Sequence, residues 1–358
     1  MMKQLLSLTI LLGSLQLAHS QQINTDAIVH FWQVVDNLKK DQPLSDSLWN
    51  SFYQLPGNID YMRKNRWNEQ AAEYRKYLEW IFRPSLSDSL KARLNGDTEP
   101  ADDILDNLLY IRSNEQQLRL YTPQIIATEY LQQCRQLAKQ YLPPHKFRPI
   151  PANMTIYVMA MTFDAAVQDS SMYFGVTRLY EYDRFRKGAI AGHEMHHQMR
   201  VNKDIRKKVS SADSASYSVL DQINSEGCAD LIDKMLLLDN AGKVFRGANV
   251  VHRLIDNAPQ AIRALDSCFR INASGNTAYI SDRQFNRITN YSSGHLPGMY
   301  MVSIIRRNGM EAALIAHNDN PFRFFYLYNA AAAKDGTHPP LFSETAITYL
   351  KELEKRVW

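Results

Sequence analysis

Hydrophobic residues recur three or four positions apart along most of the chain, the spacing that places them on one face of an α-helix. Between residues 23 and 142 this pattern predicts a run of helices and no strand. Its clearest stretch is 123–142, where Thr122 favours the N-cap and Pro123 the first helical position. The apolar stripe of this stretch consists of Ile126, Tyr130, Cys134, Leu137 and Tyr141. We expect one helix with one buried face here.

Two β-prone segments, 155–161 and 172–180, interrupt the helical pattern. Both are rich in β-branched and aromatic residues, which favour strands, so they predict a small sheet. Helical periodicity then returns in six segments, which are 186–202, 215–238, 246–270, 296–309, 320–334 and 343–357. The chain is therefore predicted to be mainly α with one small mixed β-sheet, an α+β fold.

Prolines mark a boundary between the helical first part and the rest of the chain. Four of them lie within nine residues, and such a density ends a helix. They are Pro143, Pro144, Pro149 and Pro151. We therefore expect a helical N-terminal region at 21–145 and a second region at 146–358.

The first twenty residues carry a different pattern, that of a secretory signal peptide. Lys3 precedes an apolar run from Leu5 to Leu17, and Ala18 and Ser20 are small residues at the positions that a signal peptidase reads. The run is shorter than the roughly 20 apolar residues of a membrane span. We expect cleavage after residue 20 and an exported protein, periplasmic or secreted. Because Gln21 follows the expected cut, we expect no lipid anchor, and no later segment predicts a membrane span.

Composition excludes some partners and some metal sites. The 41 Lys and Arg against 37 Asp and Glu give a net charge of +4, too small a surplus to predict a nucleic-acid partner. Three cysteines exclude a disulfide framework and a cysteine-rich zinc site, so histidines and carboxylates would have to hold any metal. After export, at most one pair among Cys134, Cys228 and Cys268 could form. The sequence leaves the pairing open, and a buried inert thiol is the alternative for each.

The strongest chemical signal is the pattern His-Glu-x-x-His at residues 193–197. On a helix, positions 193 and 197 differ by about 400° of rotation, so His193 and His197 share one face and could bind one tetrahedral cation. Glu194 would lie beside that face, where it could take a proton from a water on the metal. His196 could instead pair with His193, but the position of Glu194 favours His197 and turns His196 away. The alternative is a solvated helix end with incidental histidines.

A catalytic zinc ion usually has three protein ligands and a water, so a third ligand is needed. Glu226, in a segment predicted to be helical, is the best candidate. Asp230 follows four residues later on the same helical face, where its carboxylate could accept the spare N–H of a ligand histidine. Two alternatives stay open: Glu226 could be an exposed helix residue, and Asp230 could itself be the ligand.

These motifs resemble those of the gluzincin clan of zinc metallopeptidases. The resemblance rests on His193-Glu194-x-x-His197, with Glu226 29 residues after His197 in a Glu-x-x-x-Asp segment. The forms His-Glu-x-His-His, Ser-Glu-Gly-x-Ala-Asp and Gly-His-x-Pro-Gly-x-Tyr-Met are similar to uncharacterised zinc-peptidase families of exported bacterial proteins. The resemblance covers about residues 150–310 and does not include the N-terminal helices.

The resemblance implies a zincin-like catalytic domain at 146–358 that binds one Zn²⁺ ion. It implies that His193, His197 and Glu226 are the ligands. It implies that Glu194 is the general base. It also implies an edge strand, expected at 172–180, that holds an extended peptide by strand addition. The loop between His197 and Glu226 differs in length from that of thermolysin-like enzymes, so their substrate pockets cannot be transferred.

A second cluster of polar and aromatic residues precedes the helix predicted near residue 296. His295 lies at a turn between Gly294 and Pro297, and it is our first choice for stabilising the oxyanion opposite the metal. A purely structural histidine is the alternative. Tyr291 lies in the same cluster, and Tyr300 is expected to pack in the core, with a substrate contact as the alternative.

The leading hypothesis is an exported zinc-dependent peptidase that acts on a peptide or protein substrate. In it, zinc would lower the pKa of its water, and Glu194 would move the proton to the leaving amine. Two other hypotheses stay open: an exported helical binding protein with a structural or vestigial zinc site, and a zinc hydrolase of a non-peptide amide. Substrate preference, endo- or exo-cleavage, the role of residues 21–145 and the oligomeric state do not follow from the sequence.

Overall fold

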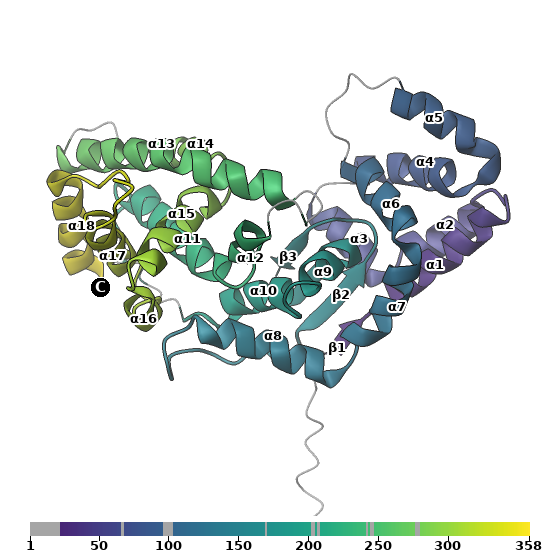
Figure 1. Cartoon of the computed structure of the whole chain (residues 1–358), viewed down its shortest axis with the longest axis horizontal. Helices are drawn as coiled ribbons and strands as arrows, with labels where there is room; N and C mark the ends of the chain where they lie inside the picture. The colour runs from purple at the N-terminus through teal and green to yellow at the C-terminus, as the bar shows by residue number, and fades with distance from the viewer. Residues whose placement is uncertain are drawn as a thin grey trace, which may run out of the picture. The chain divides into compact units, whose positions relative to one another are not determined.

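The computed structural model describes residues 22–65, 68–95, 103–168, 170–201, 205, 208–240, 243, 247–275 and 280–358 (Figure 1). The predicted signal peptide lies outside these residues. Helices dominate the rest, and four strands form one mixed sheet, which confirms the predicted fold class. The described residues form two compact units. The first contains the residues up to Ile126 together with Ile150–Thr177, and the second contains Ala127–Pro149 and Arg178–Trp358.

The helices of the first unit surround an aromatic core. Their bounds are α1 Asp26–Lys39, α2 Asp46–Tyr53, α3 Pro56–Lys64, α4 Ala71–Phe82, α5 Ser87–Asn95, α6 Asp103–Ser113 and α7 Glu115–Ile125, with the 3₁₀ turns η1 Asn68–Gln70 and η2 Pro84–Leu86. Phe31 is fully buried, with Phe52 and Phe82 within about 6 Å of it. Ser45 caps α2 by accepting a hydrogen bond from the backbone N–H of Leu48.

The sheet belongs to the first unit and has the strand order β1-β2-β4-β3. Its strands are β1 Gln22–Asn24, β2 Thr155–Met159, β3 Ala165–Gln168 and β4 Ser171–Gly175. The pairs β1·β2 and β2·β4 are parallel, whereas β3 is antiparallel to β4. The sequence pattern missed β1 and β3, because three or four residues are too few to show an alternation of period two.

The strand predicted at 172–180 is wrong in two respects: it is shorter than expected, and it does not lie at the edge of the sheet. It ends at Gly175, and Val176–Asp183 forms helix α9. A Cβ on Gly175 would lie 2.1 Å from the carbonyl oxygen of Thr162, so the chain passes too close here for any other residue. Because β4 is paired on both sides, it is not an edge strand, and the expected strand addition at 172–180 is excluded. Residues 172–176 are apolar without a clear period, which hid the change to a helix.

The helix predicted at 123–142 also differs from the structure. Pro123 lies inside the last turn of α7, and α8 begins at Thr128, after an extended Ala127. The buried face of α8 retains Tyr130, Cys134 and Leu137 from the predicted stripe, whereas Ile126 is exposed. The proline-rich segment 143–151 then forms neither a helix nor a strand, as expected of a segment that ends a helix.

The regular elements of the second unit, among its described residues, are all helices. Its helices are α8 Thr128–Gln140, α9 Val176–Asp183 from Arg178 onward, α10 Ala189–Met199, α11 Ser214–Asp230, α12 Lys234–Asp239, α13 Gly247–Ala273, α14 Asp282–Ile288, α15 His295–Arg307, α16 Glu311–Ala316, α17 Pro321–Ala332 and α18 Glu344–Val357. The helix predicted at 215–238 divides into α11 and α12, and the short α14 and α16 were not predicted. None of the helices in the described part of the chain has the length and apolarity that crossing a membrane requires.

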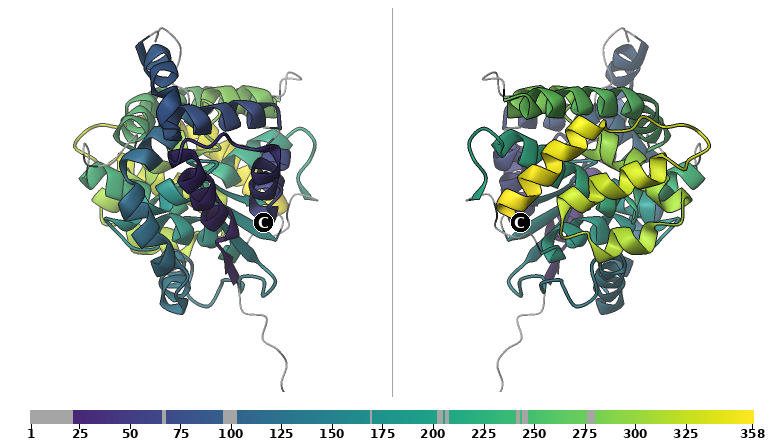
Figure 2. Two further views of the ribbon diagram at one scale, coloured as in Figure 1. Left: turned by 90° about the vertical axis from the view of Figure 1, so that its right-hand side faces the viewer. Right: turned by 90° about the vertical axis from the view of Figure 1, so that its left-hand side faces the viewer.

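Aromatic residues fill the core of the second unit. The ring of Phe269 lies about 6 Å from those of Phe285, Phe325 and Phe342. These residues come from α13, α14 and α17 and from the segment before α18, and α18 packs against α13 and α17 (Figure 2). This core holds the C-terminal helices together and leaves α10, α11 and α15 to form the polar centre.

The three cysteines are unpaired and buried. Burial raises the pKa of the Cys228 thiol to about 12 and that of the Cys268 thiol to about 11, and it also raises the pKa of Cys134. They are therefore inert thiols of the core, which is the alternative that the sequence left open for each.

Candidate metal centre

Small residues place α10 in the interior of the second unit. Gly188, with a φ of +81°, precedes the helix, and its N–H donates a 2.8 Å hydrogen bond to Oδ1 of Asp183. A Cβ on Gly192 would lie 3.0 Å from the Cβ of Leu137 on α8. The run Ala189–Gly192 therefore lets α10 approach α8 closely, and the next residue, His193, is 3% exposed.

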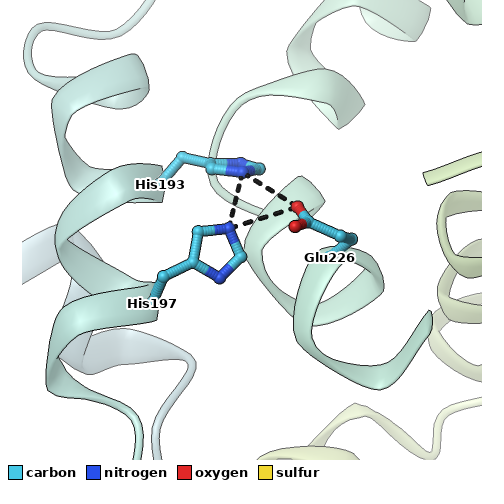
Figure 3. Close-up of side chains that lie close together, drawn as sticks. All are labelled: His193, His197 and Glu226. Atoms are coloured by element: carbon cyan, nitrogen blue, oxygen red, sulfur yellow. Dashed lines mark hydrogen bonds and ion pairs between the residues drawn. The ribbon is translucent and has the colours of Figure 1, made fainter. Parts of the chain in front are cut away.

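The structure brings together the side chains of His193, His197 and Glu226 (Figure 3). The Nε2 atoms of the two histidines are 3.1 Å apart. Oε2 of Glu226 lies 3.1 Å from Nε2 of His197 and 3.4 Å from Nε2 of His193. Ligand atoms about 2.1 Å from a tetrahedral zinc ion lie about 3.4 Å from one another. The three atoms are therefore spaced as three ligands of one such ion are.

The carboxylate of Glu226 carries the clearest sign of a missing partner. Its Oε2 is buried and accepts no hydrogen bond from the part of the chain that the structure describes. A buried anionic oxygen without a partner is costly, and a cation at this position would remove the cost. Burial would raise the pKa of the Glu226 carboxyl, but the imidazoles of His197 and His295 outweigh it and hold this pKa well below its usual range.

Both candidate ligand histidines are oriented by a polar contact of the Nδ1 atom, on the side of the ring away from Glu226. Nδ1 of His193 lies 2.9 Å from Oδ1 of Asp233, and Nδ1 of His197 lies 3.0 Å from Oγ of Ser225. These contacts direct each Nε2 toward Glu226, as outer partners do for metal-bound histidines. Burial alone would lower the pKa of His193, but Asp233 and Glu226 raise it to about 10.

Asp233 takes the place in which the sequence put Asp230. Oδ1 of Asp230 is 3.9 Å from Nδ1 of His193, and its close contact is with His295 instead. Sequence reasoning missed both Asp233 and Ser225. The spacing held a signal for Asp233, because residues 226, 230 and 233 fall on one face of a continuous helix.

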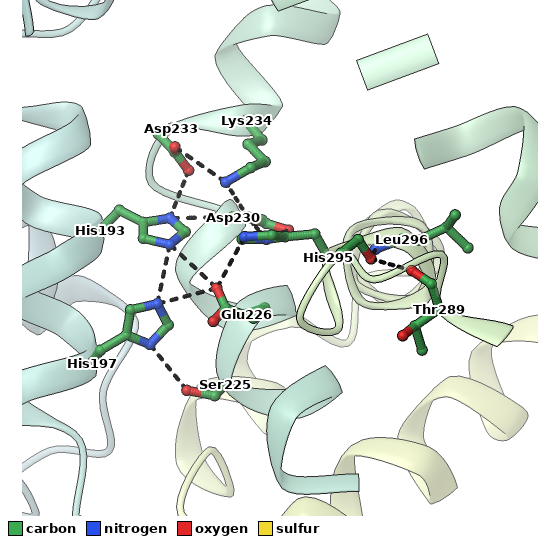
Figure 4. Close-up of polar contacts among 11 residues, drawn as sticks. His193, His197, Ser225, Glu226, Asp230, Asp233, Lys234, Thr289, His295 and Leu296 are labelled. Atoms are coloured by element: carbon green, nitrogen blue, oxygen red, sulfur yellow. Dashed lines mark hydrogen bonds and ion pairs between the residues drawn. The ribbon is translucent and has the colours of Figure 1, made fainter. Parts of the chain in front are cut away.

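His295, the first residue of α15, faces the same centre (Figure 4). Its Nδ1 lies 3.0 Å from Oδ1 and 3.2 Å from Oδ2 of Asp230. Its Nε2 lies 3.4 Å from Oε2 of Glu226. The side chain is 24% exposed, so the ring lies at the rim of the buried cluster rather than inside it.

Three glycines hold α15 against α11 at this position. A Cβ on Gly227 would lie 2.9 Å from the carbonyl oxygen of Gly298, and one on Gly298 would lie 2.8 Å from that of Ile223. Gly294, with a φ of +100°, lies equally close to the backbone of α11. The two backbones therefore touch, and His295 is brought next to Glu226.

Residues 49–337 match the model of a family described as "Putative zinc dependent peptidase (DUF5700)". This match covers well over half of the chain. The chain belongs to this family. Because the match begins within α2, it includes most of the N-terminal helices, and the extent of about 150–310 expected from the motifs was too short. No curated protein and no solved structure matches the chain.

In this member of the family, Glu194 lies directly after His193 on α10 and is partly exposed. Among the residues that the structure describes, its carboxylate makes no side-chain hydrogen bond and no ion pair. A partly exposed carboxylate without a protein partner can accept a proton from a water or a substrate.

His196 points away from Glu226, into the interior behind α10. Its Nε2 lies 3.0 Å from Nδ2 of Asn318, and the same amide donates to the carbonyl of Tyr141 at 2.6 Å. Burial lowers the pKa of His196 well below its ordinary value, so the ring is neutral. His196 therefore packs and bonds as a structural residue. Tyr300 packs partly buried against the core, and Tyr291 is 66% exposed.

Proposed function

We propose that this protein is a zinc-dependent peptidase in which His193, His197 and Glu226 hold one Zn²⁺ ion, as in gluzincins. Zinc dependence and peptidase activity are what the family description states. The ligand assignment is carried by one observation: Oε2 of Glu226, buried without a hydrogen bond, faces two Nε2 atoms at the spacing of zinc ligands.

The donor set suits zinc, because two imidazole nitrogens and one carboxylate oxygen leave a fourth position open in a tetrahedral site. When bound, the ion would supply a Lewis acid that polarises a carbonyl group and lowers the pKa of a water. Glu194 would accept the proton of the attacking water and pass it to the nitrogen of the leaving amine. Its position next to His193 and its unpartnered carboxylate support this role.

We assign to His295 the stabilisation of the negative carbonyl oxygen. Asp230, fully buried, accepts from Nδ1 of His295 and fixes the orientation of the ring. Nε2 of that ring lies on the Glu226 side of the centre, where it would donate to an oxyanion when it carries a hydrogen. Asp230 thus serves His295 and not a ligand histidine.

The substrate class we propose is a peptide or protein. All residues of the centre lie in the second unit and within 146–358, the region expected to be the zincin-like catalytic domain. Export to the periplasm or the medium, after cleavage of a signal peptide, stays a prediction from the sequence.

Replacement of the base tests this proposal most simply. Glu194→Gln should keep stoichiometric zinc and lower the cleavage of a broad peptide library by about 10²- to 10⁴-fold, because the proton acceptor is lost. Zinc is measured by metal analysis and cleavage by mass spectrometry. Glu352→Gln, an exposed glutamate on α18, serves as the matched control.

Full activity in Glu194→Gln would refute the role of the base. Stoichiometric zinc with no cleavage by the natural sequence would favour the alternative of a structural zinc site. Cleavage of an amide outside peptides, with peptides left intact, would favour the hydrolase of a non-peptide amide.

A further inference from the structure

A buried lysine lies between the two aspartates of the centre. Lys234, the first residue of α12, is 7% exposed. Its Nζ lies 2.8 Å from Oδ1 of Asp230 and 3.5 Å from Oδ2 of Asp233 (Figure 4). Both aspartates are fully buried, so the ammonium group is in contact with two carboxylates that water does not reach.

Each of these aspartates contacts a different imidazole. Asp233 accepts from Nδ1 of His193, a proposed zinc ligand. Asp230 accepts from Nδ1 of His295, the proposed oxyanion donor. Lys234 is thus in contact with the acceptors that orient both rings, one at the metal and one at the rim.

Lys234 offsets part of the negative charge of the cluster. Glu226, Asp230 and Asp233 contribute three carboxylates, and the ammonium of Lys234 forms ion pairs with two of them. Without the ammonium, Asp230 would lose its 2.8 Å ion pair and Asp233 its 3.5 Å one, and buried carboxylates that lose a charged partner turn toward water. The imidazoles of His295 and His193 would then lose the acceptors that orient them.

Lys234 also explains why only one ion is expected. Donor atoms of His193, Asp230 and His295 form a second group within 4.8 Å of one another. The ammonium of Lys234 already lies 2.8 Å from the Asp230 oxygen of this group, and both histidines direct Nδ1 to a carboxylate. The lysine thus supplies the positive charge that a second cation would bring.

We propose that Lys234 is a positioning residue that fixes the zinc-ligand ring of His193 and the oxyanion-donor ring of His295 together, through Asp233 and Asp230. This inference rests on the proposed function. A lysine that only neutralised buried charge would matter for folding, whereas a positioning lysine must also change zinc affinity and turnover.

The test compares Lys234→Met with Lys351→Met, an exposed lysine on α18. In Lys234→Met we expect zinc affinity, measured by chelator competition, to fall by about 10- to 100-fold, as for the loss of other outer partners. At saturating zinc, kcat should fall while KM stays nearly constant. The imidazole N–H signals of His193 and His295 in ¹⁵N NMR spectra should both shift. Lys351→Met should leave all these quantities unchanged.

A double-mutant cycle separates positioning from a general effect on the fold. In a His295→Ala background, Lys234→Met should still weaken zinc binding but should cost no further loss of kcat. An equal loss of kcat in both backgrounds, or natural zinc affinity in Lys234→Met, would overturn the proposal. If Lys234→Met does not fold, Lys234→Gln, uncharged but still a hydrogen-bond donor, is measured in the same way.

The failure of the proposed function is distinguishable from the failure of this inference. A natural protein that binds zinc but cleaves no peptide would refute the peptidase assignment. In that case zinc affinity and the imidazole signals still decide the role of Lys234. Unshifted signals and unchanged affinity would then refute it.

Discussion

Two buried polar clusters lie beside α10, and they differ in the kind of atom that is left without a hydrogen bond. The front cluster, around His193, His197 and Glu226, has more carboxylates than cationic groups and a carboxylate oxygen without a hydrogen bond. The back cluster pairs one guanidinium, that of Arg200, with one carboxylate, that of Asp221, at 2.9 Å.

This difference distinguishes a candidate metal centre from a structural cluster. The unsatisfied side-chain atoms of the back cluster include Nη2 of Arg200 and Nδ1 of His196, which are nitrogens and not anionic oxygens. In the front cluster the unsatisfied atom is a carboxylate oxygen, Oε2 of Glu226, and an added cation would satisfy it. Histidines one residue apart in the sequence, His196 and His197, therefore serve a structural network and a candidate metal centre, respectively.

The largest expected effect comes from exchanging one histidine of each cluster for alanine. In His197→Ala, zinc affinity should fall by more than the roughly 100-fold that loss of an outer partner costs, and cleavage should be lost, because a ligand is removed. His196→Ala should keep its zinc, although it is less stable, because its ring bonds only to the back cluster. Metal analysis and peptide cleavage check both variants. Loss of zinc from His196→Ala with retention in His197→Ala would reverse the two assignments.

Breaking the back cluster should cost stability and leave zinc binding intact. Arg200→Met removes the 2.9 Å ion pair with Asp221, and breaking a buried ion pair costs about 3–5 kcal/mol of the unfolding free energy. Urea denaturation measures this loss. Arg356→Met, which breaks an exposed pair with Asp213, should cost less than about 1 kcal/mol.

A loss of zinc affinity in folded Arg200→Met would contradict the comparison. It would show that the back cluster also contributes to zinc binding.

The smallest expected effect tests how the front cluster is held in place. In Gly227→Ala, the new Cβ would lie 2.9 Å from the carbonyl oxygen of Gly298, so α11 and α15 must move apart. We expect a loss of about 1–3 kcal/mol in unfolding free energy, together with a lower kcat, since His295 moves with α15. Gly336→Ala, where a Cβ would meet no atom within 4 Å, is the control. Unchanged kcat in Gly227→Ala would show that the backbone contact does not place His295.

Residues of the centre that are near one another in the sequence could be predicted together, whereas contacts between distant segments could not. His193 and His197 could be placed together because four residues of an α-helix return to the same face. Glu226 was chosen because a catalytic zinc ion usually has a third protein ligand, and its role as that ligand is a proposal. Asp233 was missed although its spacing from Glu226 and Asp230 fits one helical face, because the sequence does not show which of the two aspartates contacts His193. Lys234 was missed because nothing local shows that its ammonium is buried.

The secondary structure was likewise predictable only where the pattern is local. Amphipathic helices such as α13 and α18 were predicted with nearly the observed bounds, because each buries one face. The strand predicted at 172–180 failed because β4 is buried from Met172 to Gly175, so its apolar residues run on into α9 without a change of period. Gly227 and Gly298 gave no sign that they touch, since contact between two helices leaves no period in the sequence.

The most direct test of the central claim is an anomalous difference map, collected at the zinc absorption edge from crystals of the zinc-loaded protein. The account predicts one peak, about 2.0–2.2 Å from Nε2 of His193, Nε2 of His197 and a carboxylate oxygen of Glu226. A peak bound instead by His193, Asp230 and His295, or no peak at a protein-to-zinc ratio that saturates binding, would contradict it.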